Sequence, residues 1–343
     1  MAINETCTPR IVIENNALDG IGDIVEGGRA LIVADETTMR VAGDRVKKAL
    51  EEKGIDVSVY FAKISDEKTV SEAVDAVKES GAEIVLGIGG GTCIDIAKLS
   101  SFRNNVPFIS VPTSAAHDGI CSPVASIKQA DGLKSYPAKP PIAVVADILI
   151  IKNAPEKFYA AGVGDLIANF TAVADWELAR DEKGDEFNEE SAELSRKSAQ
   201  AILEAIDSVA ERSDEGVRIV MDALIKSGVS MCMAGSSRPC SGAEHLFSHN
   251  LDKIAGFPAL HGAQCGVGAI LMAKLHGLDW EKYKEVLEKV GAPTTAKELG
   301  VSEGQIVQAL VSAHMLRDRY TILHKAPLNE EKAKELAKIT GVI

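Results

Sequence analysis

The alternation of short apolar runs with amphipathic stretches between residues 10 and 150 constrains the fold most strongly. Runs rich in β-branched residues predict strands, and the stretches between them have the periodicity of helices. This order is typical of crossover units on a largely parallel, doubly wound sheet. The predicted strands are Arg10–Glu14, Ala30–Ala34, Val57–Ala62, Glu83–Ile88, Pro107–Val111 and Ala143–Asp147, and the predicted helices are Thr38–Lys53, Lys68–Ser80 and Thr92–Phe102.

The pattern changes after Asn153, where the segments become helical with few strand-like runs. We therefore expect an α/β N-terminal domain at 1–152 and an all-α C-terminal domain at 153–343. The polar segment Lys128–Pro141 is expected to form a protruding hairpin or loop. The predicted helices of the second half are Pro155–Arg180, Asn188–Arg212, Glu215–Met233, Ser241–Lys253 and Gly262–His276.

Composition argues against several classes of protein. The formal net charge of −13 and the lack of a Lys/Arg run disfavour a nucleic-acid surface. No apolar run approaches the length of a membrane span, and the first ten residues, MAINETCTPR, lack the pattern of a secretory leader. The six cysteines form no CxxC pair, so we expect a reduced, cytoplasmic protein without membrane insertion.

A triple-glycine turn at Gly89, Gly90 and Gly91 follows a predicted buried strand and precedes a helix. Without a Cβ these residues let the backbone approach a pyrophosphate, and the N–H groups and dipole of the helix favour negative charge there. A dinucleotide phosphate is therefore the expected ligand. The GxGxxG fingerprint lacks its third glycine here, so a structural tight turn is the alternative.

A second polar loop follows the predicted strand Pro107–Val111 and contains hydroxyls, a carboxylate and an imidazole. Loops at the carboxyl ends of parallel strands border the ligand crevice, so we expect this loop to lie beside the glycine turn. Thr113, Ser114 and Ser122 could bond nicotinamide or phosphate, or could cap their own backbone.

Histidines cluster in the second half. His245 and His249 are one helical turn apart on a single face, and His261 opens the next apolar segment. Imidazole is the commonest protein ligand of divalent transition metals, and a site with few protein ligands leaves positions open for Lewis-acid catalysis. Considered alone, these residues could also be ordinary hydrogen-bonded histidines.

Five motifs follow one another along the chain, namely GGGTCIDIAK, PTSAAHDGICSPVAS, AGVGDLIAN, SGAEHLFSHNLD and LHGAQCGVG. Together they resemble the metal-dependent polyol dehydrogenases, a family that includes glycerol dehydrogenase, the iron-containing alcohol dehydrogenases and, more distantly, dehydroquinate synthase. Within that family the chain is most similar to the archaeal-type sn-glycerol-1-phosphate dehydrogenases. The resemblance spans residues 10 to 290.

The resemblance implies one metal ion per subunit, usually zinc, held by Asp165, His245 and His261. It also implies that Asp118, Asp165 and His249 bind substrate, with Asp118 and His249 as the catalytic candidates. A fourth metal ligand is the alternative role for His249, and Cys240 and Cys265 are expected to be small buried residues. The glycine turn and the resemblance together assign dinucleotide binding to Gly89, Gly90, Gly91, Thr92, Cys93, Ile94, Asp95, Thr113, Ser114, Ala115, Ala116 and Ser122.

The activity implied by the resemblance is reduction of dihydroxyacetone phosphate by NADH or NADPH to sn-glycerol 1-phosphate, for archaeal ether phospholipid biosynthesis. The metal would polarise the carbonyl, and Asp118, His249 or a metal-linked water would supply the proton. Family habit implies a homo-oligomer. The alternatives are a dehydrogenase for unphosphorylated polyols, a dehydroquinate-synthase-like lyase that releases phosphate, and a non-catalytic nucleotide and metal sensor.

Overall fold

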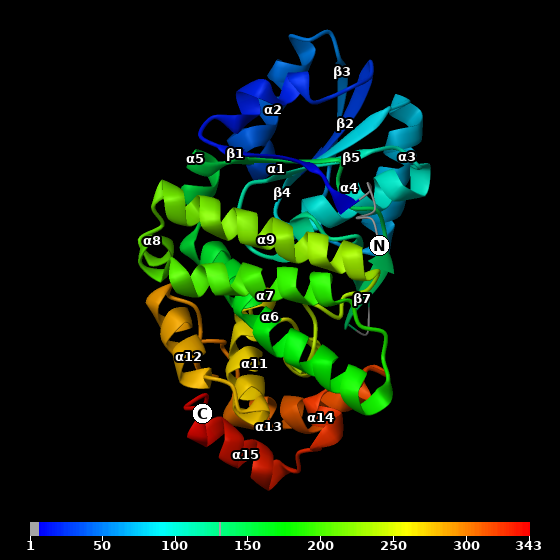
Figure 1. Ribbon diagram of the computed structural model, residues 1–343. Coiled ribbons are helices and arrows are strands. Elements are labelled where there is room, and N and C mark those ends of the chain that lie inside the picture. Colours follow the sequence, from blue (N-terminus) through cyan, green and yellow to red (C-terminus); the bar gives the residue numbers. More distant parts are fainter. Residues whose placement is uncertain (1–6, 130–131) are drawn as a thin grey trace.

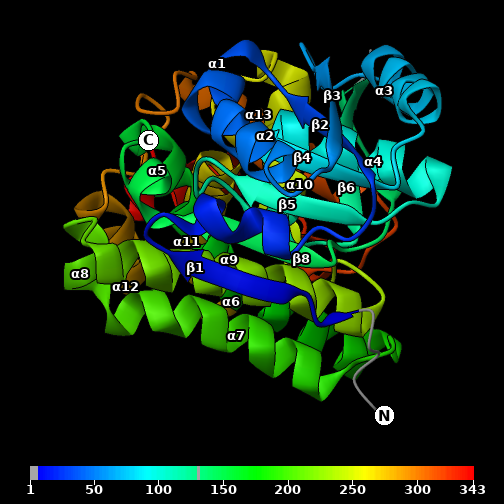
Figure 2. The ribbon, with the colours of Figure 1, turned by 90° about the horizontal axis from the view of Figure 1, so that it is seen from above.

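The computed structural model describes residues 7–129 and 132–343 (Figures 1 and 2). In Figure 1 the sheet with its helices occupies the upper part of the view, and the helices of the second half lie below it. The prediction that the N-terminus lacks a secretory leader concerns the first ten residues, and residues 1–6 lie outside the described ones. Residues 130 and 131 of the predicted hairpin or loop also lie outside them. No helix in the described ranges is long and apolar enough to cross a membrane.

The central sheet has six parallel strands in the order β1-β8-β5-β4-β2-β3. The strand order reverses between β2 and β4, which is where ligands bind in open α/β sheets. A separate antiparallel hairpin, β6-β7, occupies the segment predicted as a hairpin or loop. The strands are β1 (Arg10–Glu14), β2 (Arg29–Ala34), β3 (Asp56–Phe61), β4 (Ile84–Gly89), β5 (Phe108–Pro112), β6 (Val124–Gln129), β7 (Gly132–Pro137) and β8 (Ala143–Asp147).

Both faces of the sheet are covered, as the doubly wound prediction requires. Along β2, Ala30, Ile32 and Ala34 pack in one apolar cluster with α2 and η2, while Leu31 and Val33 pack in the other with α3 and α4. The elements of this half are η2 (Ala17–Asp23), α1 (Glu36–Thr38), η3 (Met39–Gly43), α2 (Asp44–Glu51), α3 (Glu67–Ser80), α4 (Gly91–Asn104), η4 (Asp118–Ile120) and α5 (Ile148–Lys152).

The second half is helical, as predicted, and α6 packs along α11 and α7 in it. The stretch Asn188–Arg212, predicted as one helix, is two helices, because the backbone at Ala205 leaves helical geometry between α7 and α8. The helices are α6 (Glu156–Lys183), α7 (Glu189–Glu204), α8 (Ile206–Ala210), α9 (Asp214–Ala234), α10 (Ala243–Ala255), α11 (His261–His276), α12 (Trp280–Lys289), α13 (Glu303–Ser312), η5 (Ala313–Met315), α14 (Ile322–Lys325) and α15 (Glu330–Ile339).

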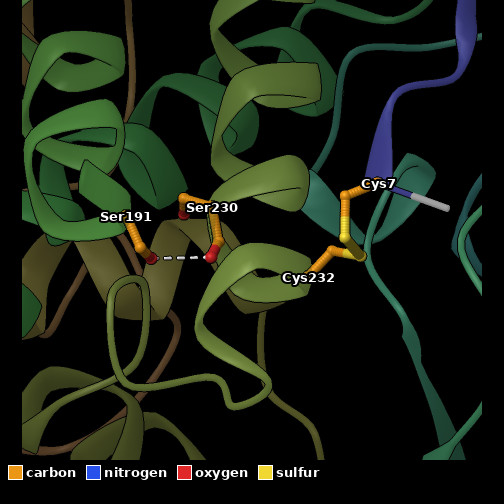
Figure 3. The surroundings of a disulfide bond; sticks show 4 residues. All are labelled: Cys7, Ser191, Ser230 and Cys232. Atoms are coloured by element: carbon orange, nitrogen blue, oxygen red, sulfur yellow. Dashed lines mark hydrogen bonds between the residues drawn. A yellow bond between two sulfur atoms is a disulfide. The ribbon is translucent and has the colours of Figure 1, made fainter. Parts of the chain in front are cut away.

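The expectation of six reduced cysteines is wrong for one pair. Cys7, just before β1, forms a disulfide with Cys232 near the end of α9 (Figure 3). The two residues are separated by 225 positions, so their spacing carries no signal, but β1 packs on α9 and brings their Cα atoms to 5.7 Å. The other cysteines, Cys93, Cys121, Cys240 and Cys265, are free and buried. The cysteines therefore no longer support the prediction that the protein resides in a reducing compartment.

Candidate active site

A cleft of about 1540 Å³ lies where the glycine turn, the second polar loop and the helices of the second half meet. β4 and β5 are neighbours with Gly89 paired to Pro112, so the turn after β4 and the loop after β5 emerge at the same edge of the sheet. The predicted proximity of the two segments is confirmed. The cleft wall contains every predicted dinucleotide residue except Gly89, Ile94 and Ala115.

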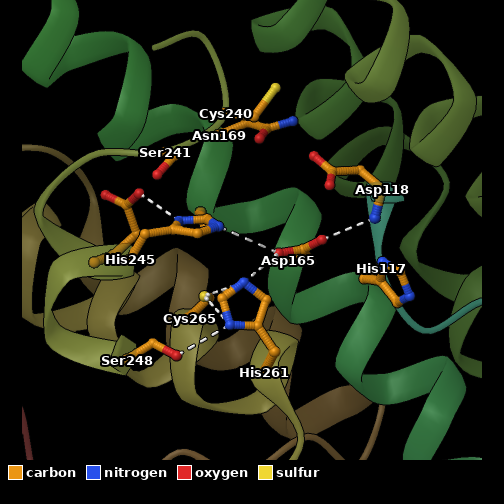
Figure 4. A network of polar contacts seen from close by, with 12 residues as sticks. His117, Asp118, Asp165, Asn169, Cys240, Ser241, His245, Ser248, His261 and Cys265 are labelled. Atoms are coloured by element: carbon orange, nitrogen blue, oxygen red, sulfur yellow. Dashed lines mark hydrogen bonds and ion pairs between the residues drawn. The ribbon is translucent and has the colours of Figure 1, made fainter. Parts of the chain in front are cut away.

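The structure brings Asp165, His245 and His261 together from three different helices (Figure 4). The Oδ1 atom of Asp165 lies 3.7 Å from Nε2 of His245 and 4.0 Å from Nε2 of His261. One donor atom from each of these residues and from Cys265 fits within a group spanning 4.8 Å. Such a set of oxygen and nitrogen donors, with a thiol beside it, could hold a transition metal ion.

Glycines allow α6 and α11 to approach closely enough for this convergence. A Cβ on Gly164 would lie 2.3 Å from the carbonyl oxygen of Gly262, and a Cβ on Gly262 would lie 2.0 Å from that of Ala161. Asp165 and His261, the neighbours of these glycines in sequence, are thereby held face to face. In the GVGD and HG sequences, the glycines are thus needed for the close packing of the two helices, and the Asp and His residues supply the donor atoms.

A buried carboxylate orients His245. Nδ1 of His245 lies 2.9 Å from Oε1 of Glu244, which also accepts from the backbone N–H of Gly242 at 2.6 Å. The other oxygen of Glu244 accepts a hydrogen bond from Thr171 at 2.8 Å. Burial alone would raise the pKa of Glu244, but the hydrogen bond and charge of His245 and the backbone N–H of Gly242 hold it below its ordinary value. With Nδ1 engaged, Nε2 of His245 faces Asp165, which is the arrangement of a metal-ligating histidine.

Asp118 adjoins this cluster from the polar loop. Its backbone N–H donates to Oδ2 of Asp165 at 2.9 Å, as Figure 4 shows, and its own carboxylate accepts from Ser227 of α9 at 2.8 Å. Burial and the neighbouring Asp165 carboxylate raise the pKa of Asp118 to about 7. Asp118 therefore presents a protonatable oxygen at the cleft wall, next to a metal-ligand candidate.

His249 also lines the cleft, one turn along α10 from His245. Its ring centroid is 5.5 Å from that of His261 and 6.5 Å from that of His245, and its buried Nδ1 has no hydrogen-bond partner among the described residues. Burial and the charge of Arg317 lower the pKa of His249 to about 3. The compact donor group includes Cys265 but not His249.

The glycine turn leaves backbone donors free. α4 begins at Gly91 with Gly90 as its N-cap, and no side chain caps this end. Gly89 has a φ of 152°, which suits glycine, and a Cβ on Gly91 would lie 2.6 Å from Nε2 of His117. The uncapped first turn of α4 thus lies at the cleft wall, where a phosphate could bind to its N–H groups.

Two of the predicted dinucleotide-binding residues have side chains that are already hydrogen-bonded or fully buried. The carboxylate of Asp95 accepts from the backbone of Ser126 and pairs with Lys98, and Ile94 is fully buried in the core. Lys98 was not predicted, although it is completely buried and donates to the carbonyls of Gly119 and Val124 at 2.6 and 2.7 Å. A charged residue in the middle of a predicted helix gives no sequence signal for such a role.

Comparison with known proteins identifies the family. A family model described as iron-containing alcohol dehydrogenase matches residues 12–155. A protein of Thermococcus sibiricus named glycerol-1-phosphate dehydrogenase, NAD(P)+, is 51% identical over 318 residues, which cover 92% of this chain and 91% of the relative. A relative of the same name from Methanosarcina acetivorans is 47% identical over 97% of this chain and 95% of its own. This chain belongs to the glycerol-1-phosphate dehydrogenase family.

Solved structures place this member of the glycerol-1-phosphate dehydrogenase family in a wider fold group. The glycerol dehydrogenase of Schizosaccharomyces pombe superposes with a TM-score of 0.81 at 18% identity, over 97% of this chain and 89% of that one. The NADH-dependent butanol dehydrogenase A of Thermotoga maritima gives 0.75 at 19% identity, over 97% and 96%. The predicted resemblance, fold class and enzyme class are confirmed.

Proposed function

We propose that the enzyme reduces the C2 carbonyl of dihydroxyacetone phosphate with NAD(P)H to give sn-glycerol 1-phosphate, and catalyses the reverse oxidation. The observation that carries this proposal is the convergence of Asp165, His245 and His261 in the same cleft as the glycine turn. Reduction adds a hydride to the carbonyl carbon and a proton to its oxygen, so the cleft must hold the nicotinamide, the ketone and a proton donor together.

The described residues fit a divalent metal ion. Asp165 is 3% exposed, burial raises its pKa, and its Oδ1 atom has no hydrogen-bond partner. An ionised carboxylate in that position calls for a cation. Asp165, His245 and His261 would hold the ion, and zinc suits this donor set. When bound, the ion supplies Lewis-acid polarisation of the substrate oxygen.

The glycine turn and the polar loop would bind the coenzyme. The free N–H groups at the start of α4 would receive the pyrophosphate, with Gly90 and Gly91 giving the backbone access to it. Thr113 and Ser114, at the end of β5, would face the nicotinamide half. Lys98 fixes the position of the loop from beneath, because its ammonium group ties Gly119 and Val124 to α4.

Asp118 and His249 would bind the substrate, and Asp118, with its pKa raised to about 7, would serve as the proton donor. Both residues line the cleft. In the described part of the chain, no Lys or Arg forms an ion pair with the carboxylate of Asp118 or with the imidazole of His249. Asp118 is held by Ser227, which leaves its second oxygen available. The orphaned Nδ1 of His249 is a buried polar atom that a substrate hydroxyl could satisfy.

The proposal has finer parts that follow from family membership. These are zinc as the resident metal, a role in archaeal ether phospholipid biosynthesis, a cytoplasmic location, assembly into a homo-oligomer, and division into a nucleotide-binding unit at 1–152 and a metal- and substrate-binding unit at 153–343.

A stereochemical product assay tests the function. The purified, zinc-loaded enzyme is given dihydroxyacetone phosphate with NADH or with NADPH, and the glycerol phosphate is resolved by chirality. We expect sn-glycerol 1-phosphate with loss of nicotinamide absorbance, and no turnover by an Asp165→Asn variant. Equal rates with unphosphorylated dihydroxyacetone would indicate a polyol dehydrogenase instead. Phosphate release without a change in absorbance would indicate a lyase.

A further inference from the structure

The cleft contains a group of cations that the reaction centre does not use. Arg317 and Arg319, in the segment between η5 and α14, line the cleft together with Lys128 of β6. Lys253 lies one helical turn beyond His249 on α10. In a chain of net charge −13, such a gathering of positive side chains in one cleft suits an anionic ligand.

The two arginines differ in how their guanidinium groups are engaged. Arg319 donates to the carbonyl of Ser241 at 2.6 Å and to the hydroxyl of Ser237 at 2.9 Å, so it ties its segment to the loop before α10. Arg317 makes one long hydrogen bond, 3.5 Å, to the hydroxyl of Ser135 on β7. Since a guanidinium has five N–H donors, most of the donors of Arg317 remain free.

No carboxylate in the described part of the chain pairs with Arg317. Burial lowers its pKa. A partly buried cation without a counter-ion is unfavourable, and a ligand anion would relieve that cost. Arg317 also lies near the reaction centre, because it lines the same cleft as His249 and His261.

From these observations we propose that Arg317 is the principal ligand of the substrate's phosphate group, with Arg319 as a positioning residue that fixes the segment carrying it. This inference rests on the proposed function for the identity of the substrate. The planar guanidinium fork of Arg317 would bind two phosphate oxygens, while the ketone end of the same molecule lies at His249 and the Asp165 cluster. Arg317 would thus select phosphorylated over unphosphorylated trioses.

The test compares Arg317→Met and Arg317→Lys with wild type and with Arg180→Met. Arg180 is a partly exposed residue of α6 outside the cleft, and it carries the same charge. For each metal-loaded protein, kcat/KM is measured for dihydroxyacetone phosphate and for dihydroxyacetone, and the binding of inorganic phosphate is measured by calorimetry. Metal content and melting temperature are recorded for every variant.

We expect Arg317→Met to lose roughly 100-fold in kcat/KM for the phosphorylated substrate, mostly through KM, and to change little with dihydroxyacetone. Arg317→Lys should lose roughly 10-fold, because it keeps the charge but not the fork. Phosphate binding should weaken in parallel, whereas Arg180→Met should match wild type. Equal losses on both substrates, or an unchanged KM for the phosphorylated one, would overturn the assignment.

The outcomes separate the assignment from the proposed function. If wild type does not reduce dihydroxyacetone phosphate but binds inorganic phosphate through Arg317, the function fails and the anion site stands. If wild type reduces it and Arg317→Met does so equally well, the function stands and the assignment fails.

Discussion

The nucleotide side of the cleft is built from backbone, whereas the metal side is built from side chains that separate helices deliver. On the first side, contiguous residues of one turn supply free N–H groups, and small residues keep the surface open. On the second side, the side chains of Asp165, His245 and His261 supply the donor atoms. Asp165 and His261 are 96 positions apart in the sequence and meet only because α6 packs against α11.

This difference teaches how each side should respond to mutation. A backbone site is damaged by adding atoms, because the donors themselves cannot be removed by substitution. A side-chain site is damaged by removing one ligand or by loosening the residue that orients it. The predictions below test whether the two sides can be disabled separately.

The largest effect is expected for His245→Ala. Loss of this imidazole should remove the metal and lower kcat by roughly 1,000-fold or more, because Lewis-acid polarisation is worth several kcal/mol. Coenzyme affinity should stay within about twofold, since His245 belongs to α10 and not to the glycine turn. Elemental analysis, steady-state rates and coenzyme fluorescence measure the three quantities.

Cys265→Ser is the matched control for His245→Ala. Cys265 lies in the same donor group, but the family resemblance assigns the metal to Asp165, His245 and His261, so we expect serine at Cys265 to retain the metal. Stoichiometric metal in His245→Ala, together with its loss in Cys265→Ser, would show that the thiol is the ligand and the imidazole is not.

A smaller effect is expected for Glu244→Gln, which keeps the shape of the side chain that orients His245 but removes its charge. Metal affinity should fall by about 10- to 100-fold, as for other carboxylates behind metal-ligating histidines. Competition with a chelator of known affinity gives the value. Glu193→Gln, on the exposed surface of α7, should leave metal affinity unchanged. Equal affinities in both variants would mean that Glu244 serves only the fold.

On the nucleotide side, Gly90→Val should weaken coenzyme binding by roughly 10-fold without loss of metal. A Cβ at Gly90 would meet only the Ser114 hydroxyl, at 3.8 Å, so the folded protein tolerates the added atoms while the cleft does not. Gly304→Val, in α13 away from the cleft, controls for the added side chain. A loss of metal in Gly90→Val would break the proposed independence of the two sides.

The same difference explains what could be predicted from the sequence. The alternation of strands and helices is local, so β1 and β8 have the bounds that were predicted and the other sheet strands differ by about a residue. The glycine turn is contiguous, and its place at the sheet edge follows from the parallel order of the strands. The convergence of Asp165 with the histidines required the resemblance, because nothing near Asp165 distinguishes it from a capping or solvated acid.

Residues that act through distant partners escaped prediction. Glu244 adjoins His245 in sequence, yet its role depends on Thr171 and on the backbone of Gly242, which only the fold brings to it. Arg317 is one of many basic residues and becomes distinctive because no carboxylate of the described residues forms an ion pair with it. The Cys7–Cys232 pair was missed for the same reason, since long separation leaves no pattern.

The smallest effect on the cleft is expected when that disulfide is removed. Cys7→Ser should lower the free energy of unfolding by about 2 to 4 kcal/mol, because the bond closes a long loop in the unfolded chain, while kcat/KM stays within about twofold. Denaturant titration gives the stability. Dithiothreitol should lower the stability of wild type to that of Cys7→Ser and should not affect the variant further.

An unexpected change in activity would have a specific route to the cleft. Cys232 and Ser227 lie on α9, and the hydroxyl of Ser227 donates to Asp118 at 2.8 Å. If Cys7→Ser lowered kcat, then Ser227→Ala should lower it as well, and the double variant should show no additional loss. Additive losses would instead place the effect of the disulfide outside the contact between α9 and Asp118.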